Sequence, residues 1–263
     1  MTITGATRVY AHIGFPISHV RTPALYNALL AERDIDVVVV PVEVAPEDLP
    51  SMAPGFRAWR SLCGVGVTIP HKETMAELVD ELTPMARLCG ATNVIRRDPD
   101  GRLVGGQFDG IGLSQSILDA GHELKGTRVL LAGAGGTARA VAFALADSGV
   151  AELRISNRTA SKAEAIAAEV SAAYPACDAR LHDGGTDFDI VVNTTSLGMK
   201  EGDVLPVDPA VVRPGILVAD AVMSPPETAL LKLAAERGAT PHPGILMLRA
   251  QFERTLEFLR LAE

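Results

Sequence analysis

Lys72 and Asp109 are the two side chains of this sequence best placed to transfer a proton. Lys72 follows the apolar run 64–69 and falls in the first turn of a predicted helix, where the helix dipole disfavours a positive charge. This position suggests a functional reason, although a lysine considered alone here would be interpreted as a surface residue. Asp109 lies in the segment Gly106–Gly110, at the predicted junction between two domains.

A lysine–aspartate pair beside a nicotinamide ring suits the interconversion of an alcohol and a ketone. Hydride passes to or from the substrate carbon while a proton leaves or reaches the substrate oxygen. A lysine ammonium is a ready proton donor for ketone reduction at neutral pH, whereas a lysine base requires desolvation that favours the neutral amine. A nearby aspartate opposes that effect and is suited to orienting the substrate hydroxyl. The residues alone leave the division of these roles open.

A glycine-rich loop follows the apolar run 128–132 and precedes an alanine-rich helical pattern at 136–148. Gly133 permits a tight turn, Gly135 lets the backbone approach a pyrophosphate, and Ala138 holds the small position where helix and strand pack closely. The helix N-terminus then offers N–H groups and the positive end of its dipole to the phosphates. The sequence therefore predicts a Rossmann-type dinucleotide loop formed by Gly133, Ala134, Gly135, Gly136 and Thr137.

The residues after the next predicted strand, 153–156, distinguish NADP from NAD. An NAD enzyme usually carries an acidic residue there to bind the ribose hydroxyls, and this chain has none between Ser156 and Lys162. Arg158 is suited to a charge-assisted pair with a 2′-phosphate. Lys162, one turn further on, either adds charge or is a solvated helix position. We predict NADP as the cofactor and NAD as the less favoured one, with Asn157, Arg158, Thr159 and Lys162 on the phosphate side.

Strand and helix patterns alternate along most of the chain. Val- and Ile-rich strands alternating with helices indicate an α/β fold with mostly parallel sheets. Thr22 is predicted to cap the first helix with Pro23 at its first position, and Pro41 indicates an edge strand. The predicted strands are 8–13, 37–42, 64–69, 128–132, 153–156, 189–192 and 216–222, with a hairpin of 92–97 and 102–105. The predicted helices are 22–32, a helix from about 71, 110–120, 136–148, 161–172, 227–237 and 246–261.

Composition excludes several classes of protein. The 263 residues carry a net charge of −8, which argues against nucleic acid or an anionic membrane as a partner. Three cysteines stand far apart, so we expect small buried hydrophobes in a reducing compartment rather than disulfides or a metal site. No apolar run approaches the length of a membrane span, and the N-terminus lacks a signal-peptide pattern. We therefore expect a cytoplasmic protein.

Eight segments of the chain, in order, resemble motifs of the shikimate dehydrogenase family. They extend over nearly the whole sequence, and so many ordered matches leave little room for chance. Val67–Lys72 resembles the family's catalytic-lysine motif, and Gly133–Arg139 with Asn157–Thr159 resembles its NADP loop and adenosine-phosphate clamp. The others are Gly14–His19, Gly90–Asn93, Asp109–Gly110, Asn193–Met199 and Met247–Gln251.

The resemblance implies a role for several side chains. Lys72 and Asp109 would be the catalytic pair, and Asn93 and Gln251 would bind ring hydroxyls with Thr68 beside them. The hydroxyl of Thr22 would help to bind the substrate. We also predict that Thr195, Met223 and Gly244 bind the cofactor. The last helix would return to the substrate domain. This gives a mixed, mostly parallel α/β substrate domain of residues 1–109 and 243–263 and a Rossmann-type NADP domain of residues 110–242.

The chain departs from the family pattern mainly where the family holds the substrate carboxylate. Val20 and Thr22 stand in place of two serines, Gly66 in place of an asparagine, Phe108 in place of a threonine, and Met223 in place of a tyrosine. A hydrogen bond to a charged group contributes about 1.5–3 kcal/mol. Losing two would weaken carboxylate binding by about two orders of magnitude unless a residue such as Arg21 replaces them. We therefore expect a divergent member with an altered substrate preference.

Together these features predict an NADP-dependent oxidoreductase that interconverts a ring hydroxyl and a ketone of a shikimate- or quinate-like alicyclic hydroxy acid. Two alternatives stay open: the same chemistry on another cyclic substrate, such as an amino-shikimate analogue or a cyclic polyol, and a non-catalytic NADP-binding sensor. We expect a small-molecule substrate, no metal, no nucleic-acid or membrane partner, and a monomer or homodimer.

Overall fold

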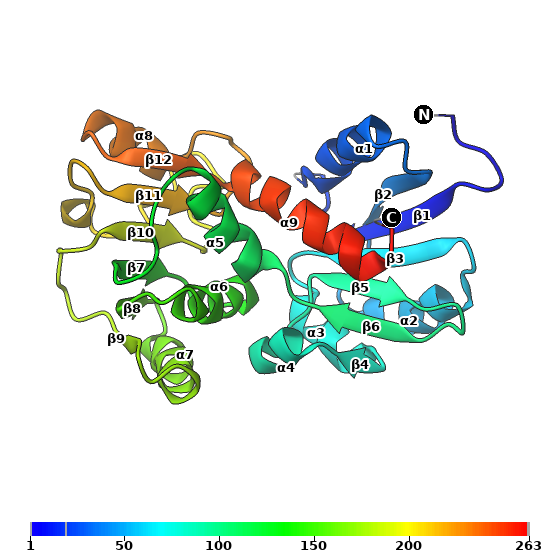
Figure 1. Ribbon diagram of the computed structural model, residues 1–263, viewed down its shortest axis with the longest axis horizontal. Coiled ribbons are helices and arrows are strands. Elements are labelled where there is room, and N and C mark those ends of the chain that lie inside the picture. The colour runs from blue at the N-terminus through cyan, green and yellow to red at the C-terminus, as the bar shows by residue number, and fades with distance from the viewer. Residues whose placement is uncertain (1, 19, 262–263) are drawn as a thin grey trace. The chain divides into compact units, whose positions relative to one another are not determined.

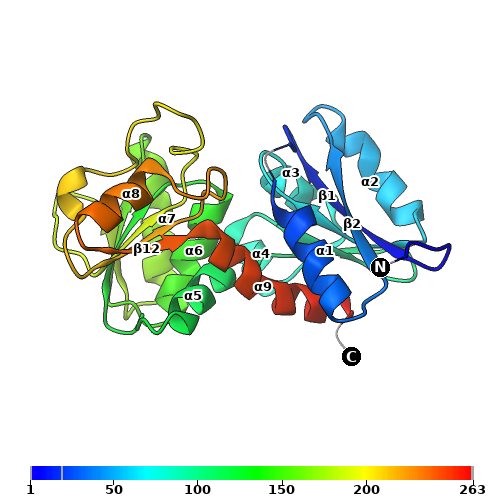
Figure 2. The same ribbon diagram turned by 90° about the horizontal axis from the view of Figure 1, so that it is seen from above.

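The computed structural model describes residues 2–18 and 20–261, which form two compact units. The first unit consists of residues 1–108 and 252–263, and the second of residues 109–251. Each unit has its own six-stranded sheet with helices packed on it (Figure 1, Figure 2). This confirms the predicted α/β class, because the alternation of apolar strands and helices gives layered units of this kind.

The sheet of the first unit has the order β2-β1-β3-β5-β6-β4 and is mixed. β5 runs antiparallel to both β3 and β6, whereas the other pairs are parallel. The predicted hairpin is therefore confirmed, and so is the edge position of the strand that contains Pro41. The strands are β1 (Arg8–Gly14), β2 (Val37–Glu43), β3 (Leu62–Val67), β4 (Glu81–Leu82), β5 (Val94–Arg97) and β6 (Leu103–Gly106).

Helices α1, α2 and α4 of the first unit differ from the prediction, α4 because the sequence did not predict it. Thr22 is the first residue of α1 and makes no capping bond, because Arg21 occupies the N-cap. The sequence did not predict α2, since Pro54 and its neighbour Gly55 are residues that normally interrupt helices. Its buried residues Leu49, Ala53 and Phe56 lie on one face and fix it to the sheet. The helices are α1 (Thr22–Glu32), α2 (Leu49–Ala58), α3 (Lys72–Leu78) and α4 (Pro84–Cys89).

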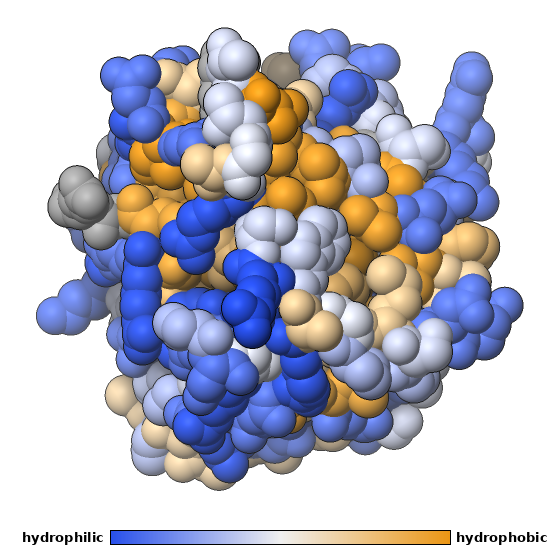
Figure 3. Space-filling view, turned by 90° about the vertical axis from the view of Figure 1, so that its right-hand side faces the viewer, coloured by the Kyte–Doolittle hydropathy of each residue, from blue (hydrophilic) through white to orange (hydrophobic). Residues whose placement is uncertain are grey.

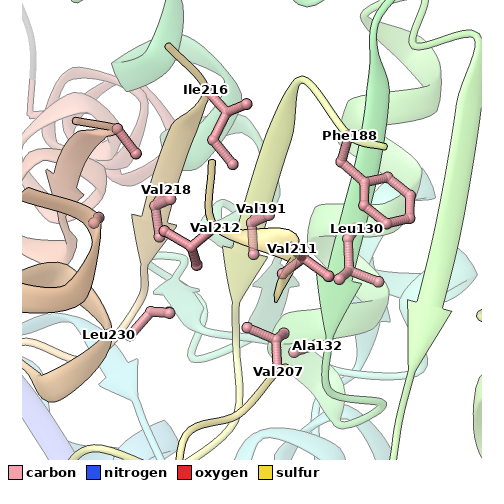
Figure 4. Close-up of a cluster of buried hydrophobic side chains, with 12 residues drawn as sticks. Leu130, Ala132, Phe188, Val191, Val207, Val211, Val212, Ile216, Val218 and Leu230 are labelled. Atoms are coloured by element: carbon pink, nitrogen blue, oxygen red, sulfur yellow. The ribbon is translucent and has the colours of Figure 1, made fainter. Parts of the chain in front are cut away.

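The sheet of the second unit is entirely parallel, in the order β12-β11-β10-β7-β8-β9. Figure 4 shows the apolar core on one of its faces, where Leu130, Val191 and Val218 meet Phe188 and Leu230. The strands are β7 (Arg128–Ala132), β8 (Glu152–Ser156), β9 (Asp178–Leu181), β10 (Ile190–Asn193), β11 (Leu217–Asp220) and β12 (Thr240–Pro243). The helices are α5 (Asp109–Asp119), α6 (Gly136–Asp147), α7 (Ala160–Ala173), the short 3₁₀ turn η1 (Pro209–Val211), α8 (Ala229–Glu236) and α9 (Gly244–Leu259).

Helix α9 contributes to both units, and it shifts the division expected from sequence. Residues 243–251 belong to the second unit, although the sequence placed them with the first. The reason is close backbone packing: a Cβ added at Gly244 would lie 2.8 Å from the carbonyl oxygens of Asp220 and Ala221. The first boundary falls before Asp109, so this carboxylate belongs to the second unit.

None of the helices among the described residues is long and apolar enough to cross a membrane. The three cysteines are buried, as predicted, and none of them forms a disulfide among the described residues. Burial raises the pKa of the Cys63 thiol to about 11, so this side chain is a neutral hydrophobe rather than a nucleophile.

Candidate active site

The sequence-predicted site residues fall into two groups, one in each unit. Thr22, Thr68, Lys72 and Asn93 belong to the first unit, and Asp109, Gln251 and the predicted cofactor residues belong to the second. Each group is described below within its own unit. The pairing of Lys72 with Asp109 stays a prediction.

The glycine loop lies at the point in the second unit's sheet where the strand order reverses. From β7 the chain builds outward through β8 and β9, and then returns to place β10 on the other side of β7. Ligands of parallel α/β sheets bind at the carboxyl edge of such a switch point. Gly133 has a φ of 118°, and a Cβ there would lie 2.6 Å from Thr194 Oγ1. Only glycine therefore fits this first turn, and Thr194, which the sequence did not predict, supports it.

Gly135 is not required by the backbone conformation or packing that requires Gly133. It caps α6 in extended conformation with no side-chain capping bond, so the helix N-terminus keeps its outward N–H groups. A Cβ added at Gly135 would meet no heavy atom within 4 Å. Packing within the protein does not require a glycine here, whereas a bound pyrophosphate close to the backbone would. This open cradle fits the predicted dinucleotide.

Arg158 follows the strand next to the loop. β7 and β8 pair in register with Ala132 opposite Ser156, and the Gly133 N–H donates to the Ser156 carbonyl at 2.7 Å. The Arg158 side chain is exposed and belongs to none of the ion pairs found within residues 2–18 and 20–261. The backbone two residues before Arg158 thus lies beside the glycine loop, and a contact of the exposed guanidinium with a 2′-phosphate stays a prediction.

The turn that carries Arg158 is held by its neighbours. The Asn157 side-chain amide donates to the Thr159 carbonyl at 3.0 Å, and Thr159 is the N-cap of α7. Lys162 is exposed in the first turn of that helix. Asn157 thus shapes the turn through its side chain, while a phosphate contact from Thr159 or Lys162 stays a prediction.

Asp109 is buried at the start of α5, where its carboxylate accepts a hydrogen bond from the Thr137 hydroxyl at 3.2 Å. Thr137 belongs to the glycine loop's helix, so the predicted catalytic acid lies directly beside the predicted cofactor loop. The following residue explains how α5 comes so close. A Cβ at Gly110 would lie 2.1 Å from the Ala140 carbonyl oxygen, and the two helix backbones are therefore in contact at a glycine.

Gln251 packs against α5 at Gly112. A Cβ at Gly112 would approach the Gln251 Cβ to 2.9 Å and the Met247 carbonyl to 2.8 Å. Residues 109 and 112 are three apart on one helix and share a face, so Gln251 lies on the side of α5 that carries Asp109. Gln251 is buried, and its contact with a ligand stays a prediction.

A buried polar network holds Thr195, another of the predicted cofactor residues, in place. Asn193 Oδ1 accepts from both the N–H and the hydroxyl of Thr195, and Asn193 Nδ2 donates to Asp220 Oδ1 at 2.9 Å. Asp220 also accepts from Val222 N and Thr228 Oγ1. Burial raises the pKa of Asp220, while these hydrogen bonds oppose the rise.

The network ties together the loops after β10 and β11. Thr195 is thereby held in place, and Met223, directly after Val222, is half-buried. Sequence reasoning missed Asn193 and Asp220 as positioning residues, although both are polar residues that end buried strands. Gly244 is required by the packing of α9 described above, so its predicted cofactor role is not needed to explain the glycine.

Backbone hydrogen bonds in the first unit bring Thr68, Lys72 and Asn93 to one edge of its sheet. Val67 N donates to the Asn93 carbonyl at 2.8 Å, and Thr92 N donates to the Lys72 carbonyl at 2.9 Å. The Asn93 Oδ1 accepts from Phe108 N at 2.9 Å. This bond fixes the carboxamide so that its NH₂ group is the part suited to a ligand.

His71, the neighbour of Lys72, has a structural role. It is buried, and its Nε2 lies 2.8 Å from the Val44 carbonyl oxygen. The imidazole therefore joins the N-terminus of α3 to the segment after β2. This contact fixes the helix turn on which Lys72 stands.

The departures from the family pattern have structural explanations at two positions. A Cβ at Gly66 would lie 2.2 Å from His12 Nδ1 and 2.9 Å from Tyr10 Oη. The buried His12 imidazole thus fills the space that an asparagine side chain would need. Phe108 packs against Phe258 in a tilted arrangement with ring centroids 5.2 Å apart, so it serves packing within the first unit. Thr22 is also buried.

Comparison with protein families finds a match in each of the two parts of the chain. The pattern of the shikimate dehydrogenase substrate binding domain matches residues 12–95, and that of shikimate / quinate 5-dehydrogenase matches residues 113–199. The shikimate dehydrogenase (NADP(+)) of Rubrobacter xylanophilus is 41% identical over 256 residues, covering 95% of this chain and 89% of that protein. The chain belongs to the shikimate dehydrogenase family.

Two solved structures that resemble this chain belong to proteins with different names. Shikimate 5-dehydrogenase from Listeria monocytogenes, in complex with shikimate and NAD, has a TM-score of 0.87 and 32% identity, covering 100% of this chain and 95% of its own. The ligand-free 5-ketofructose reductase of Gluconobacter sp. strain CHM43 has a TM-score of 0.84 and 31% identity, covering 96% and 92%. The same fold therefore occurs in proteins named for a cyclic acid and for a keto sugar.

Proposed function

We propose that this protein is an NADP-dependent dehydrogenase that interconverts a ring hydroxyl and a ketone of a shikimate- or quinate-like substrate. The observation that carries the proposal is the hydrogen bond between Asp109 and Thr137. It places a buried carboxylate against the first turn of the helix that follows the glycine loop. A binding protein without catalysis would not need a titratable group at this position.

The proposed roles follow from the chemistry of the side chains. Lys72 carries the proton to or from the substrate oxygen, and Asp109 orients the reacting hydroxyl. The amide groups of Asn93 and Gln251 bind neighbouring ring hydroxyls, and Thr68 lies next to them in the chain segment that leads to Lys72. When bound, NADP supplies the hydride or accepts it. Gly133–Thr137 would hold its pyrophosphate and Arg158 its 2′-phosphate.

The cradle at Gly135 provides a test that separates ligand binding from folding. We expect Gly135→Ala to leave the thermal unfolding temperature within about 2 °C of the wild-type value, because the new methyl group meets no protein atom. We expect the dissociation constant for NADP to rise at least about tenfold, since the methyl group would separate the backbone from the pyrophosphate.

Fluorescence titration with NADPH and a thermal melt measure the two quantities. Gly110→Ala is the matched control, because there the added Cβ would collide with the Ala140 carbonyl and stability should fall. Unchanged NADPH affinity in Gly135→Ala would show that the dinucleotide does not use this cradle.

Arg158 is proposed to select NADP over NAD. We expect Arg158→Ala to raise KM for NADP about 10- to 100-fold, because a charge-assisted hydrogen bond contributes about 1.5–3 kcal/mol, and to change KM for NAD by less than about twofold. Steady-state kinetics with both cofactors measure this. Arg180→Ala, which removes an exposed arginine of the same unit, is the control. Equal effects on NADP and NAD would exclude a 2′-phosphate role.

A second candidate function is the same redox chemistry on an uncharged cyclic polyol or keto sugar. Three observations favour it: Val20 and Met223 cannot donate side-chain hydrogen bonds, His12 fills the space beside Gly66, and a relative of the same fold is named for 5-ketofructose reduction. A panel of shikimate, quinate, cyclic polyols and keto sugars, compared by kcat/KM, decides between the candidates. The carboxylate-free substrate is favoured if its value exceeds that of shikimate.

We also propose that the protein acts in the cytoplasm as a monomer or homodimer. The three buried cysteines, none of which forms a disulfide among the described residues, support a reducing compartment.

A further inference from the structure

The first unit contains a concave surface lined by arginines, at the edge of its sheet away from the predicted substrate residues. We call it the basic pocket. Arg8 begins β1 and Leu62 begins β3, whereas Thr68 follows the opposite end of β3. Leu62 and Thr68 are six positions apart along this extended segment, so their Cα atoms are roughly 20 Å apart. The lining consists of Arg8, Arg57, Ala58, Arg60, Leu62, Arg96, Arg97, Asp98, Pro99, Asp100, Leu259 and Arg260.

The basic pocket is a product of the fold rather than of one charged segment. Its arginines come from the start of β1, the end of α2, the β5–β6 hairpin and the end of α9. Figure 3 shows this end of the first unit, with strongly hydrophilic side chains in dark blue gathered near the middle of the face. The volume of about 860 Å³ is that of a site for a small organic molecule.

Carboxylates neutralise only part of the positive charge. Asp98 pairs with Arg96 at 2.7 Å and with Arg260 at 3.5 Å, and these partners lower the pKa of Asp98. Arg57 pairs with Asp80. The lining contains two carboxylates, Asp98 and Asp100, and six guanidinium groups, in a protein whose net charge is −8. The pocket is therefore locally positive, although the protein as a whole carries a negative net charge.

Three of the six guanidinium groups have no carboxylate partner. Arg97 donates to carbonyl oxygens instead, to Arg57 O at 2.8 Å and to Asp98 O at 3.1 Å, which holds its planar group in place. The side chains of Arg8 and Arg60 are exposed and take part in none of the hydrogen bonds or ion pairs found among the described residues. Guanidinium groups fixed or available in this way bind phosphate and carboxylate oxygens in pairs.

We propose that the basic pocket binds a small organic polyanion that carries two or more phosphate or carboxylate groups. Its anionic groups lie against Arg8, Arg60 and Arg97, and its carbon skeleton lies on the apolar floor formed by Leu62 and Leu259. The site is separate from the predicted redox site and lies wholly within the first unit. It therefore does not depend on the proposed function.

Isothermal titration calorimetry at a constant ionic strength of about 0.15 M, where the Debye length is about 8 Å, tests the proposal without long-range charge effects. The probes are tripolyphosphate and citrate, which separate a phosphate ligand from a carboxylate ligand. We expect one of them to bind the wild-type protein with one-to-one stoichiometry. The double variant R8A/R60A should bind it at least about tenfold more weakly.

The matched control is R180A/R254A, which removes two exposed arginines outside the basic pocket and should bind within about twofold of the wild type. Circular dichroism checks that each variant is folded, and Arg60→Glu provides a second variant with reversed charge. The proposal is overturned if neither probe binds at millimolar concentration. It is equally overturned if R8A/R60A and R180A/R254A bind alike, because the probe then occupies another site such as the predicted cofactor loop.

Discussion

Lys72→Ala is expected to lower kcat by about 10³-fold while leaving the dissociation constant for NADPH within about twofold of the wild-type value. General acid–base catalysis contributes about 10²–10⁴-fold, and Lys72 belongs to the unit that does not contain the glycine loop. The substitution should therefore remove proton transfer without changing the cofactor cradle. Stopped-flow or steady-state absorbance of NADPH measures kcat, and fluorescence titration measures binding.

Two further variants sharpen the Lys72 test. Lys72→Arg keeps the positive charge but provides a group that does not release its proton at neutral pH, so its kcat should stay close to that of Lys72→Ala. Lys232→Ala removes an exposed lysine from α8 and should leave kcat unchanged. A Lys72→Ala enzyme that keeps the wild-type kcat would contradict the proposed proton transfer by Lys72. It would favour the non-catalytic sensor.

Asp109→Asn is expected to lower kcat by about 10²- to 10³-fold with little change in stability or NADPH affinity. The asparagine oxygen can still accept the hydrogen bond from Thr137, so the contact between α5 and α6 is preserved. The charge that orients and polarises the reacting hydroxyl is lost. Steady-state kinetics and a thermal melt on the same preparation separate the chemical effect from the structural one.

The control for Asp109 lies on the same helix. Asp119→Asn makes the identical change at the exposed end of α5. Among the described residues, this carboxylate accepts a hydrogen bond only from Gln115. Its kcat should match the wild type. If Asp109→Asn were as active as Asp119→Asn, the buried carboxylate would be a structural group that fixes Thr137, and the proposed reaction would lose its second proton-handling residue.

Local patterns in the sequence predicted the second unit well. The run 128–132, Gly133 and the alanine-rich helix specify a strand, a turn and a helix that depend mainly on neighbouring residues, and all three are present. Arg158 could be placed because parallel neighbours end at the same edge of a sheet. β9 and β12 were not predicted: they are short, and their alternation of apolar and polar residues is weak.

What the sequence could not predict depends on contacts between distant segments. Thr194 supports Gly133, and Gly110 is required by Ala140, yet nothing local indicates either contact. His12 and Gly66 form a similar pair, opposite each other on β1 and β3. The sequence did not predict helix α2, because prolines and glycine normally interrupt helices. Its three buried residues fix it to the sheet only once distant segments are in place. The basic pocket also needed the structure, since its arginines are spread from residue 8 to residue 260.

The most direct test of the central claim is a panel assay of the wild-type protein. It combines NADP or NAD with shikimate, quinate and related cyclic alcohols, and follows the absorbance of the reduced cofactor. The proposed function predicts that NADP is reduced with at least one of these ring alcohols, with kcat/KM at least about tenfold above that with NAD. No turnover of any ring alcohol, or a clear preference for NAD, would contradict it.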